Sequence, residues 1–368
     1  QTMTAAAPRI AAGQSEIVSL PITIPADPEP RTEYWLNIRF TLARQCPWGE
    51  PGHVVAWAQF LLPVHADVTA GRASSAPAPI RCDESGNRLQ IRGDSFALTF
   101  DLIRGRIEAW SHANADLVVQ GPRLCFWRAP IDNERFCCGV PVYENESVYR
   151  MHLLQHVTQT VRHERPGDGS VRVIVATRIA PPARSNAFLC EYVYTVWGTG
   201  DVVIDCRGEP TGEWPPALPR IGLEMAIPAT FDRVTWYGRG PGESYADSKL
   251  ANAIGLYTCD VDALYTPYVR PQENGNRTDV RWAALTDRHG LGLLAVGMPT
   301  LDFSAHRFTV ADIQAARHPC DLPARPEITL HLDHRQNGLG SASCGPGVFP
   351  GYELSCAPFR FRMRLRPF

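Results

Sequence analysis

Short runs that alternate apolar and polar residues recur along the whole chain, and this period of two restricts its fold more than any other feature. β-Branched and aromatic residues are enriched in the runs, as is typical of strands. Only residues 261–265 and 308–317 have a helical rhythm, and both segments are short. The pattern predicts an all-β protein of the sandwich type. The clearest runs are residues 33–41 (EYWLNIRFT), 95–102 (SFALTFDL), 170–178 (SVRVIVATR), 191–197 (EYVYTVW) and 359–365 (FRFRMRL).

Small residues, serine and proline concentrate in residues 71–81, and this composition predicts a linker. About four candidate strands precede it, whereas an Ig-like sandwich has roughly seven. We therefore expect residues 1–70 to be the C-terminal half of an Ig-like β-sandwich. Residues 82–368 continue without a comparable break, and we expect them to form one large β-sandwich.

The charge balance argues against two classes of partner. Lys and Arg total 36 against 38 Asp and Glu, a net charge of −2, so the basic surface of a nucleic-acid-binding protein is not expected. No apolar stretch approaches the roughly 18 residues that a membrane-spanning helix needs. Eleven cysteines occur without a CxxC pair, and no signal-peptide pattern is visible, so reduced thiols and a cytoplasmic location are expected.

Residues 265–282 hold the densest group of polar side chains in the sequence. Planar hydrogen-bonding groups beside Tyr268 and Trp282 are the mixture that carbohydrate recognition requires. An equally weighted alternative is a polar network that only holds a loop in place. The polar residues of the group are Gln272, Glu273, Asn274, Asn276, Arg277, Asp279 and Arg281.

Other patterns support no catalytic or metal site. The Gly238-x-Gly240 spacing is not followed by a phosphate-binding motif, and there is no GxSxG sequence around a serine nucleophile. Cys344 has no histidine at a recognisable spacing. His152 with His156, and His331 with His334 around Asp333, lack evident further ligands, so structural histidines and no metal site are expected.

Four long motifs, in order, resemble the C-terminal part of the bacterial β-galactosidases of glycoside hydrolase family 2. Residues 48–63 (WGEPGHVVAWAQFLLP) also resemble the end of the fourth, Ig-like domain of that family. The resemblance thus covers nearly the whole chain. The four motifs are residues 128–133 (RAPIDN), 236–248 (WYGRGPGESYADS), 264–282 (LYTPYVRPQENGNRTDVRW) and 338–346 (GLGSASCGP).

This resemblance implies that residues 82–368 are the family's fifth domain, a super-sandwich similar in fold to galactose mutarotase. In the family, the acid/base and nucleophile glutamates lie on a (β/α)₈ barrel, which precedes the region that this chain resembles. Retaining hydrolysis places two such carboxyl groups about 5 Å apart around one bond. No residue of this chain is therefore assigned a catalytic role, and no cofactor is expected on it, because the family's metal ions are expected mainly at the catalytic domain.

The family resemblance also implies a set of substrate-binding residues. A loop near the C-terminus of the fifth domain delivers an aromatic residue that stacks on the sugar, and the aligned position is Cys344, which has no aromatic face. We therefore expect a differently shaped subsite around Cys344 and Gly345. Glu273, Asn274, Asn276 and Arg277 are the other expected substrate-binding residues. Asn133, Glu134 and Arg135 begin a loop that is expected to be a mobile rim.

The leading hypothesis is a pocket-completing part of a β-galactosidase that is inactive by itself. Its expected partners are the catalytic (β/α)₈ domain or large chain of the same enzyme, a galactoside substrate and further copies of itself in a homo-oligomer. One alternative is a free-standing carbohydrate-binding module. Another is an aldose epimerase of the mutarotase type, for which Glu273, His306 and His334 could supply acid/base groups.

Overall fold

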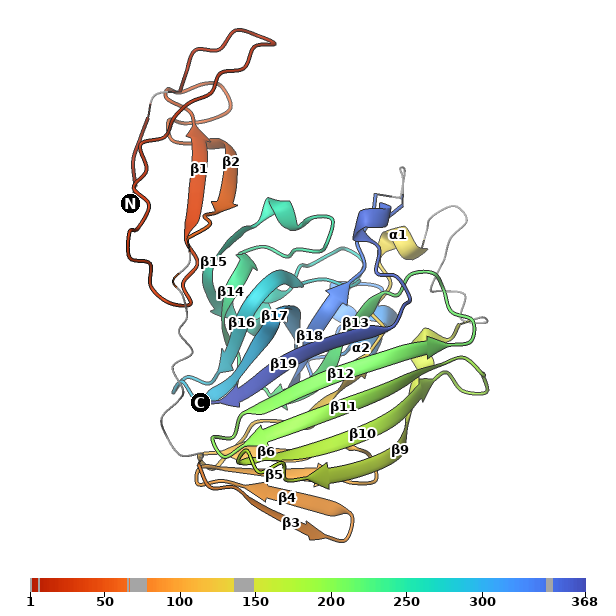
Figure 1. Cartoon of the computed structure of the whole chain (residues 1–368). Helices are drawn as coiled ribbons and strands as arrows, with labels where there is room; N and C mark the ends of the chain where they lie inside the picture. The colour runs from red at the N-terminus through yellow and green to blue at the C-terminus, as the bar shows by residue number, and fades with distance from the viewer. Residues whose placement is uncertain (1, 6, 65, 67–77, 136–148, 342–346) are drawn as a thin grey trace. The chain divides into compact units, whose positions relative to one another are not determined.

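The computed structural model describes residues 2–5, 7–64, 66, 78–135, 149–341 and 347–368 (Figure 1). The chain separates into two compact units, Gln1–Ser75 and Ala76–Phe368. The described residues contain many strands and only short helices, so the all-β prediction is confirmed. No helix among them is long and apolar enough to cross a bilayer.

The first unit contains one antiparallel pair of strands in its described residues, β1 (Trp35–Thr41) and β2 (Val54–Leu61). The expectation of about four strands before the linker is therefore wrong. Five prolines lie between residues 8 and 30, and proline cannot donate a ladder hydrogen bond, which explains why this extended stretch does not pair. Large apolar side chains on and between the two strands are exposed, among them Trp48 (65%) and Phe60 (53%).

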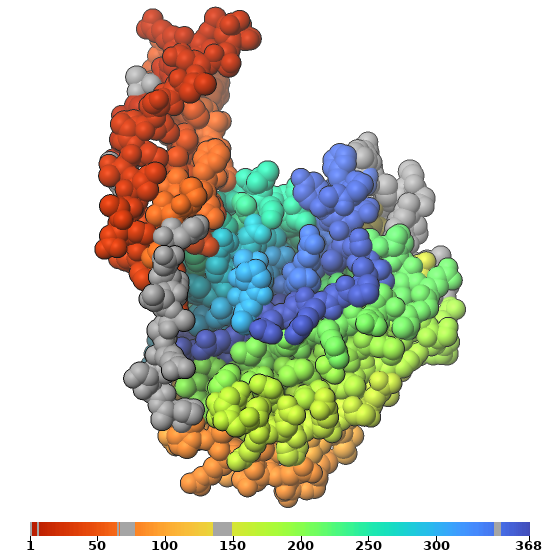
Figure 2. Space-filling model, in the orientation of Figure 1, coloured from red at the N-terminus to blue at the C-terminus, as the bar shows by residue number. Residues whose placement is uncertain are grey.

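The second unit is built from a five-stranded and a twelve-stranded sheet in its described part. The smaller sheet has the order β3-β4-β5-β6-β7, and the path of the larger is β15-β14-β16-β17-β19-β12-β11-β10-β9. Strands β8, β13 and β18 belong to the larger sheet off this path: β18 pairs with β17 and β13, and β13 with β8. Figure 2 shows the dark blue C-terminal strand β19 between cyan β17 and green β12.

The smaller sheet consists of β3 (Arg81–Ser85), β4 (Arg88–Arg92), β5 (Phe96–Asp101), β6 (Arg106–His112) and β7 (Ala115–Asp116). The larger sheet consists of β8 (Gln120–Cys125), β9 (Gln155–Glu164), β10 (Ser170–Ala180), β11 (Ala187–Trp197), β12 (Val202–Thr211), β13 (Arg220–Pro228), β14 (Arg233–Gly240), β15 (Ala253–Asp260), β16 (Arg277–Thr286), β17 (Gly292–His306), β18 (Glu327–Gln336) and β19 (Phe359–Pro367). The helices are α1 (Asp132–Arg135), α2 (Val310–Ala315) and the 3₁₀ turns Met151–Leu153, Lys249–Ala251, Val261–Leu264, Pro319–Asp321 and Pro350–Tyr352.

Apolar side chains from both sheets form one core in the second unit. Phe100 of β5 packs edge-on against Tyr194 of β11, with ring centroids 5.1 Å apart. The predicted alternation holds strand by strand: in β19, Phe361, Met363 and Leu365 are buried between exposed or half-buried arginines. Burial of one face of each strand therefore fixes the register of the sheets.

Asp312, in the first turn of helix α2, takes part in the cap of this helix. Its N-cap residue Thr309 accepts a hydrogen bond from the Asp312 N–H (3.2 Å), and Asp312 Oδ2 accepts from the Thr309 N–H (2.9 Å). The Arg325 Nε–H also donates to Asp312 Oδ2 (2.9 Å). Hydrogen bonding from Arg325 is the main reason that the pKa of Asp312 falls to about 2, although partial burial acts in the opposite direction.

Replacing Asp312 with asparagine is expected to lower the free energy of unfolding at pH 7 by about 1–2 kcal/mol, because the cap and the ion pair are both weakened. A carboxyl group whose pKa is depressed by folding contributes stability above its unfolded pKa, near 4, and loses that contribution as the pH falls towards about 2. The difference from the wild type should therefore shrink between pH 4 and pH 2. Urea unfolding at pH 7, 4 and 3 measures it, with Asp262→Asn, an exposed partner of Arg307, as control. A difference that is constant with pH would contradict the prediction.

Candidate functional site

The loop that leads into strand β16 is enclosed in protein, although its side chains are polar. Glu273, Asn274, Asn276 and Arg277 are each no more than 5% exposed. Gly275 has a φ of 75°, and a Cβ atom there would lie 2.8 Å from the Cε1 atom of His306 and from the Leu264 carbonyl oxygen. Only glycine fits both the conformation and the space, so this compact turn requires a glycine at position 275.

Asn276 joins this loop to the 236–248 motif and to strand β18. Its Nδ2–H donates to the Ser244 carbonyl (2.9 Å), and the Ser244 N–H donates to the Asn276 carbonyl (2.8 Å). The Gln336 Nε2–H donates to Asn276 Oδ1 (3.1 Å). Two segments that the sequence analysis singled out are therefore adjacent, linked by reciprocal hydrogen bonds.

The guanidinium of Arg277 is held by backbone carbonyl groups. Its Nε–H donates to Pro241 O (3.1 Å) and its Nη1–H to Gly275 O (2.7 Å). The guanidinium carbon also lies 5.5 Å from the centre of the Trp236 ring, a cation–π distance. Arg277 thus ties the cis Gly240-Pro241 corner to the buried loop.

Asn274 fixes the other end of the loop. Its Oδ1 accepts from the Thr266 N–H (3.1 Å), and its Nδ2–H donates to the Gln272 carbonyl (2.9 Å). The Asn274 carbonyl accepts a hydrogen bond from Nε2–H of His306 (3.0 Å). Burial lowers the pKa of His306 to about 4, so this imidazole is neutral at pH 7 and acts as a donor.

A buried arginine lies at the centre of the network. The Arg220 side chain is 0% exposed, and its Nη2–H donates to Glu273 Oε1 (3.1 Å), while its Nε lies 3.1 Å from Asp333 Oδ2. Burial acts to lower the pKa of Arg220, but the carboxylates of Asp333 and Glu273 raise it above its ordinary value. Burial raises the pKa of Asp333, despite the charge of Arg220 beside it. Gly222 leaves room for this carboxylate, because a Cβ atom there would lie 2.0 Å from Asp333 Oδ1.

A second buried arginine connects the RAPIDN motif to the start of the 338–346 motif. Arg128 Nη1–H donates to Asn337 O (2.8 Å) and Nη2–H to Gly338 O (3.1 Å). The same Nη2 forms an ion pair with Glu134 Oε1 (2.6 Å), and Glu134 Oε2 accepts from the Ile131 N–H (3.1 Å). Arg128 therefore fastens helix α1 to the chain that follows β18.

Asn133 and Asp247 hold the next residues of this chain. Asn133 Nδ2–H donates to the carbonyl groups of Leu339 (3.0 Å) and Gly340 (2.8 Å). The Gly340 N–H donates to Asp247 Oδ2 (2.7 Å). The 128–133 and 236–248 motifs therefore contact the first residues of the 338–346 motif, and the 264–282 motif is hydrogen-bonded to both of them through Gln272 and Asn276.

The structure brings together most of the residues that the sequence analysis assigned to substrate binding, within one hydrogen-bonded network. Their contact with substrate stays a prediction. The mobility of the rim that begins at Asn133 and Glu134 also stays a prediction, and in the structure both side chains are hydrogen-bonded to protein. Two further predicted residues and one side chain lie outside the described residues. The enclosed residues are Glu273, Asn274, Asn276 and Arg277; outside the described residues lie Cys344, Gly345 and the side chain of Arg135.

Sequence reasoning missed Arg220 and Asp333. Each alternates with apolar residues in its strand, such as Ile221 and Leu332, a pattern typical of a face exposed to solvent. In the structure the face that carries Arg220 and Asp333 is covered by the loop that carries Glu273, so both faces of these strands are buried here. A signal was present in Gly222, since glycine inside a strand indicates a close approach.

The epimerase alternative required Glu273, His306 and His334 to converge. His306 lies close enough for Glu273 to act on its pKa, but its ring donates to a backbone carbonyl. His334 instead stacks on Phe361, with ring centroids 5.3 Å apart. Because neighbouring strand residues point to opposite faces, His334 lies away from the face that carries Asp333. The three residues do not form one acid/base group.

Comparison with known proteins identifies the family of the chain. A family model described as "Beta galactosidase small chain" matches residues 92–365, and one described as "Beta-galactosidase, domain 4" matches residues 1–63. These matches place the protein in the class of glycoside hydrolases. Within that class, the chain belongs to the β-galactosidase small-chain family, as the sequence motifs predicted.

The curated relatives are much longer than this chain. It is 32% identical over 323 residues to a β-galactosidase of Priestia megaterium and 29% identical over 322 residues to one of Kluyveromyces lactis. These alignments cover 88% and 85% of this chain but only 30% of either relative. Among solved structures, a GalM/aldose epimerase homologue from C. elegans has a TM-score of 0.42 and 9% identity, covering 77% of this chain and 99% of that one.

Proposed function

We propose that this chain is the C-terminal portion of a β-galactosidase that hydrolyses terminal β-D-galactosides with retention. In this proposal the chain completes the substrate pocket, and the catalytic glutamates belong to a (β/α)₈ domain or large chain of the same enzyme. The observation that carries the proposal is the family match over residues 92–365, together with alignments that leave about 70% of each relative unmatched.

The network around the 338–346 motif supports a role in shaping the pocket. Arg128, Asn133 and Asp247 reach it from two other motifs and hold its first residues through backbone atoms. Because these hydrogen bonds involve backbone atoms of Gly338 and Gly340, they do not depend on the side chains of the motif. We infer that the buried residues, Arg277 and Asn276 included, position this loop, and that Cys344 and Gly345 face the galactoside.

The first unit supports the need for a larger partner. A single two-stranded hairpin is marginally stable by itself, and β1 and β2 expose large apolar side chains such as Trp57 (40%) and Phe60 (53%). We propose that the preceding part of the enzyme covers these strands and completes the sandwich. Association of further copies into a homo-oligomer is part of the same proposal.

Hydrolysis of nitrophenyl-β-galactoside tests the proposal. The purified chain is assayed alone, the catalytic part of the same enzyme is assayed alone, and the two are mixed. We expect no turnover by this chain and recovery of turnover in the mixture, because the two carboxyl groups that retaining hydrolysis needs are supplied only by the partner. Substantial hydrolysis by the pure chain would overturn the proposal, and galactose binding without any recovery on mixing would favour a carbohydrate-binding module.

A further inference from the structure

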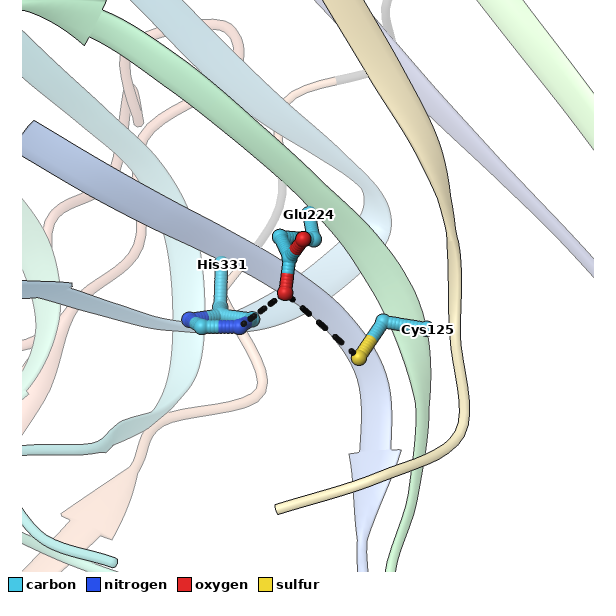
Figure 3. A group of neighbouring side chains, drawn as sticks. All are labelled: Cys125, Glu224 and His331. Atoms are coloured by element: carbon cyan, nitrogen blue, oxygen red, sulfur yellow. Dashed lines mark hydrogen bonds and ion pairs between the residues drawn. The ribbon is translucent and has the colours of Figure 1, made fainter. Parts of the chain in front are cut away.

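Three metal-ligating side chains meet close to one another (Figure 3), and one of them, His331, lies two residues before Asp333 on the same face of β18. Cys125 ends β8, Glu224 lies in β13 and His331 in β18, three neighbouring strands. The distance from Cys125 Sγ to Glu224 Oε2 is 4.0 Å, and His331 Nε2 lies 3.4 Å from the same oxygen. One potential ligand atom from each residue lies within 4.8 Å of the other two.

The Glu224 carboxylate is oriented by a fourth residue. Arg123, its cross-strand partner in β8, donates from Nη2–H to Glu224 Oε1 (2.8 Å). The other oxygen, Oε2, is thereby left facing His331 and Cys125, as Figure 3 shows. Hydrogen bonding to the non-ligating atom of a carboxylate is how proteins fix the orientation of metal ligands.

His331 is the least expected member of the group. It is 3% exposed, its Nδ1 has no hydrogen-bond partner within the described part of the chain, and its Nε2 has only the 3.4 Å contact with Glu224. Buried polar atoms nearly always have a partner, so a ligand that improves the long contact of this imidazole would be favoured here. Nε2 points toward Glu224 Oε2, the oxygen that does not accept a hydrogen bond from Arg123.

We propose that Cys125, Glu224 and His331 bind a zinc-class divalent cation. Thiolate, imidazole and carboxylate are the zinc ligands of proteins, at about 2.0–2.3 Å in tetrahedral geometry. That geometry puts ligand atoms roughly 3.3–3.8 Å apart, close to the 3.4 and 4.0 Å found here. A thiolate with an imidazole selects against magnesium and calcium, which prefer oxygen ligands.

Binding changes the protonation of the cluster in a defined way. The Cys125 thiol donates to the Trp127 carbonyl (3.2 Å), and formation of the sulfur–metal bond releases that proton to solvent. The site provides three protein ligands, so a water molecule or an oxygen from outside the triad takes the fourth position. Zinc binding can be measured without galactoside hydrolysis, so the site remains testable whether or not the proposed function holds.

Zinc binding to the reduced full-length chain tests the proposal directly. After removal of metal with a chelator, Zn²⁺ is titrated against a competing fluorescent chelator. We expect one tight equivalent per chain, with affinity reduced at least tenfold in Cys125→Ser and in His331→Gln, since each loses one ligand. Co²⁺ should give a thiolate-to-metal charge-transfer band in the wild type that Cys125→Ser lacks.

Matched variants separate this site from other thiols. Cys356→Ser and Cys320→Ser alter free cysteines elsewhere and should leave zinc affinity unchanged. Glu224→Gln keeps an oxygen for Arg123 and so preserves the fold, and it should weaken binding as the other ligand variants do. Near-UV circular dichroism verifies that each variant is folded. Absence of a stoichiometric zinc equivalent, or equal affinity in the wild type and all three ligand variants, would overturn the proposal.

Discussion

Replacing Arg220 with methionine is expected to lower the free energy of unfolding of the second unit by about 3–5 kcal/mol. The guanidinium is completely enclosed and lies 3.1 Å from Glu273 and from Asp333. Removing the cation of this trio leaves two buried carboxyl groups, and an uncompensated buried charge is far more costly than the loss of a hydrogen bond. Urea unfolding followed by tryptophan fluorescence measures the effect.

An exposed arginine provides the matched control for Arg220. Arg360 forms an ion pair with Asp205 (2.7 Å), but its side chain is 67% exposed. Arg360→Met should therefore cost less than about 1 kcal/mol. The triple variant Arg220→Met, Glu273→Gln, Asp333→Asn should recover part of the loss, because no charge then remains buried at this position. A cost for Arg220→Met as small as that of the control would refute the account of the network.

Replacing Arg128 with methionine is expected to reduce kcat/KM of the enzyme assembled with its catalytic part by tenfold or more, and stability by about 2–4 kcal/mol. Arg128 is buried and donates to Asn337 O, Gly338 O and Glu134. Without these bonds, helix α1 and the 338–346 motif lose their common anchor. A misplaced pocket loop weakens the positioning of substrate, which is worth about a hundredfold per ångström of displacement.

Hydrolysis of nitrophenyl-β-galactoside by the assembled enzyme separates positioning from folding. Arg128→Lys retains the charge but cannot reach several acceptors at once, so an intermediate loss is expected. Arg88→Met, which removes an exposed ion pair with Glu108, should leave kcat and KM unchanged. If Arg128→Met lowered stability while kcat/KM equalled that of the wild type, the loop would not depend on Arg128 for its position.

The five clearest runs of alternating residues all correspond to strands in the structure, whereas the number of strands before the linker was predicted wrongly. The run at residues 359–365 became β19, Phe359–Pro367, and the run at residues 170–178 became β10, Ser170–Ala180. The two short segments with a helical rhythm became the turn Val261–Leu264 and helix α2. Alternation succeeds because a half-buried strand must keep one face apolar, which is a local property of the chain.

The candidate site could be predicted only in part. The four motifs were recognisable because polar residues are crowded between prolines and glycines, which does not occur in an ordinary strand. Whether Asn276 and Arg277 are open to a ligand or enclosed was not predictable, because the enclosing groups come from β18 and the 236–248 motif. The alternative of a network that holds a loop describes their contacts in this structure.

The sequence by itself determined the clearest strands, the apolar face of each and the family, because these depend on residues close together in the chain. Only the tertiary structure decided which segments cover the polar faces of the strands, such as the face that carries Arg220. Arg220 and Glu273 are 53 residues apart, and Cys125 and Glu224 are 99 apart. A period of two shows which side chains share a face, but the burial of a charge, or the assembly of three metal ligands, depends on which strands become neighbours.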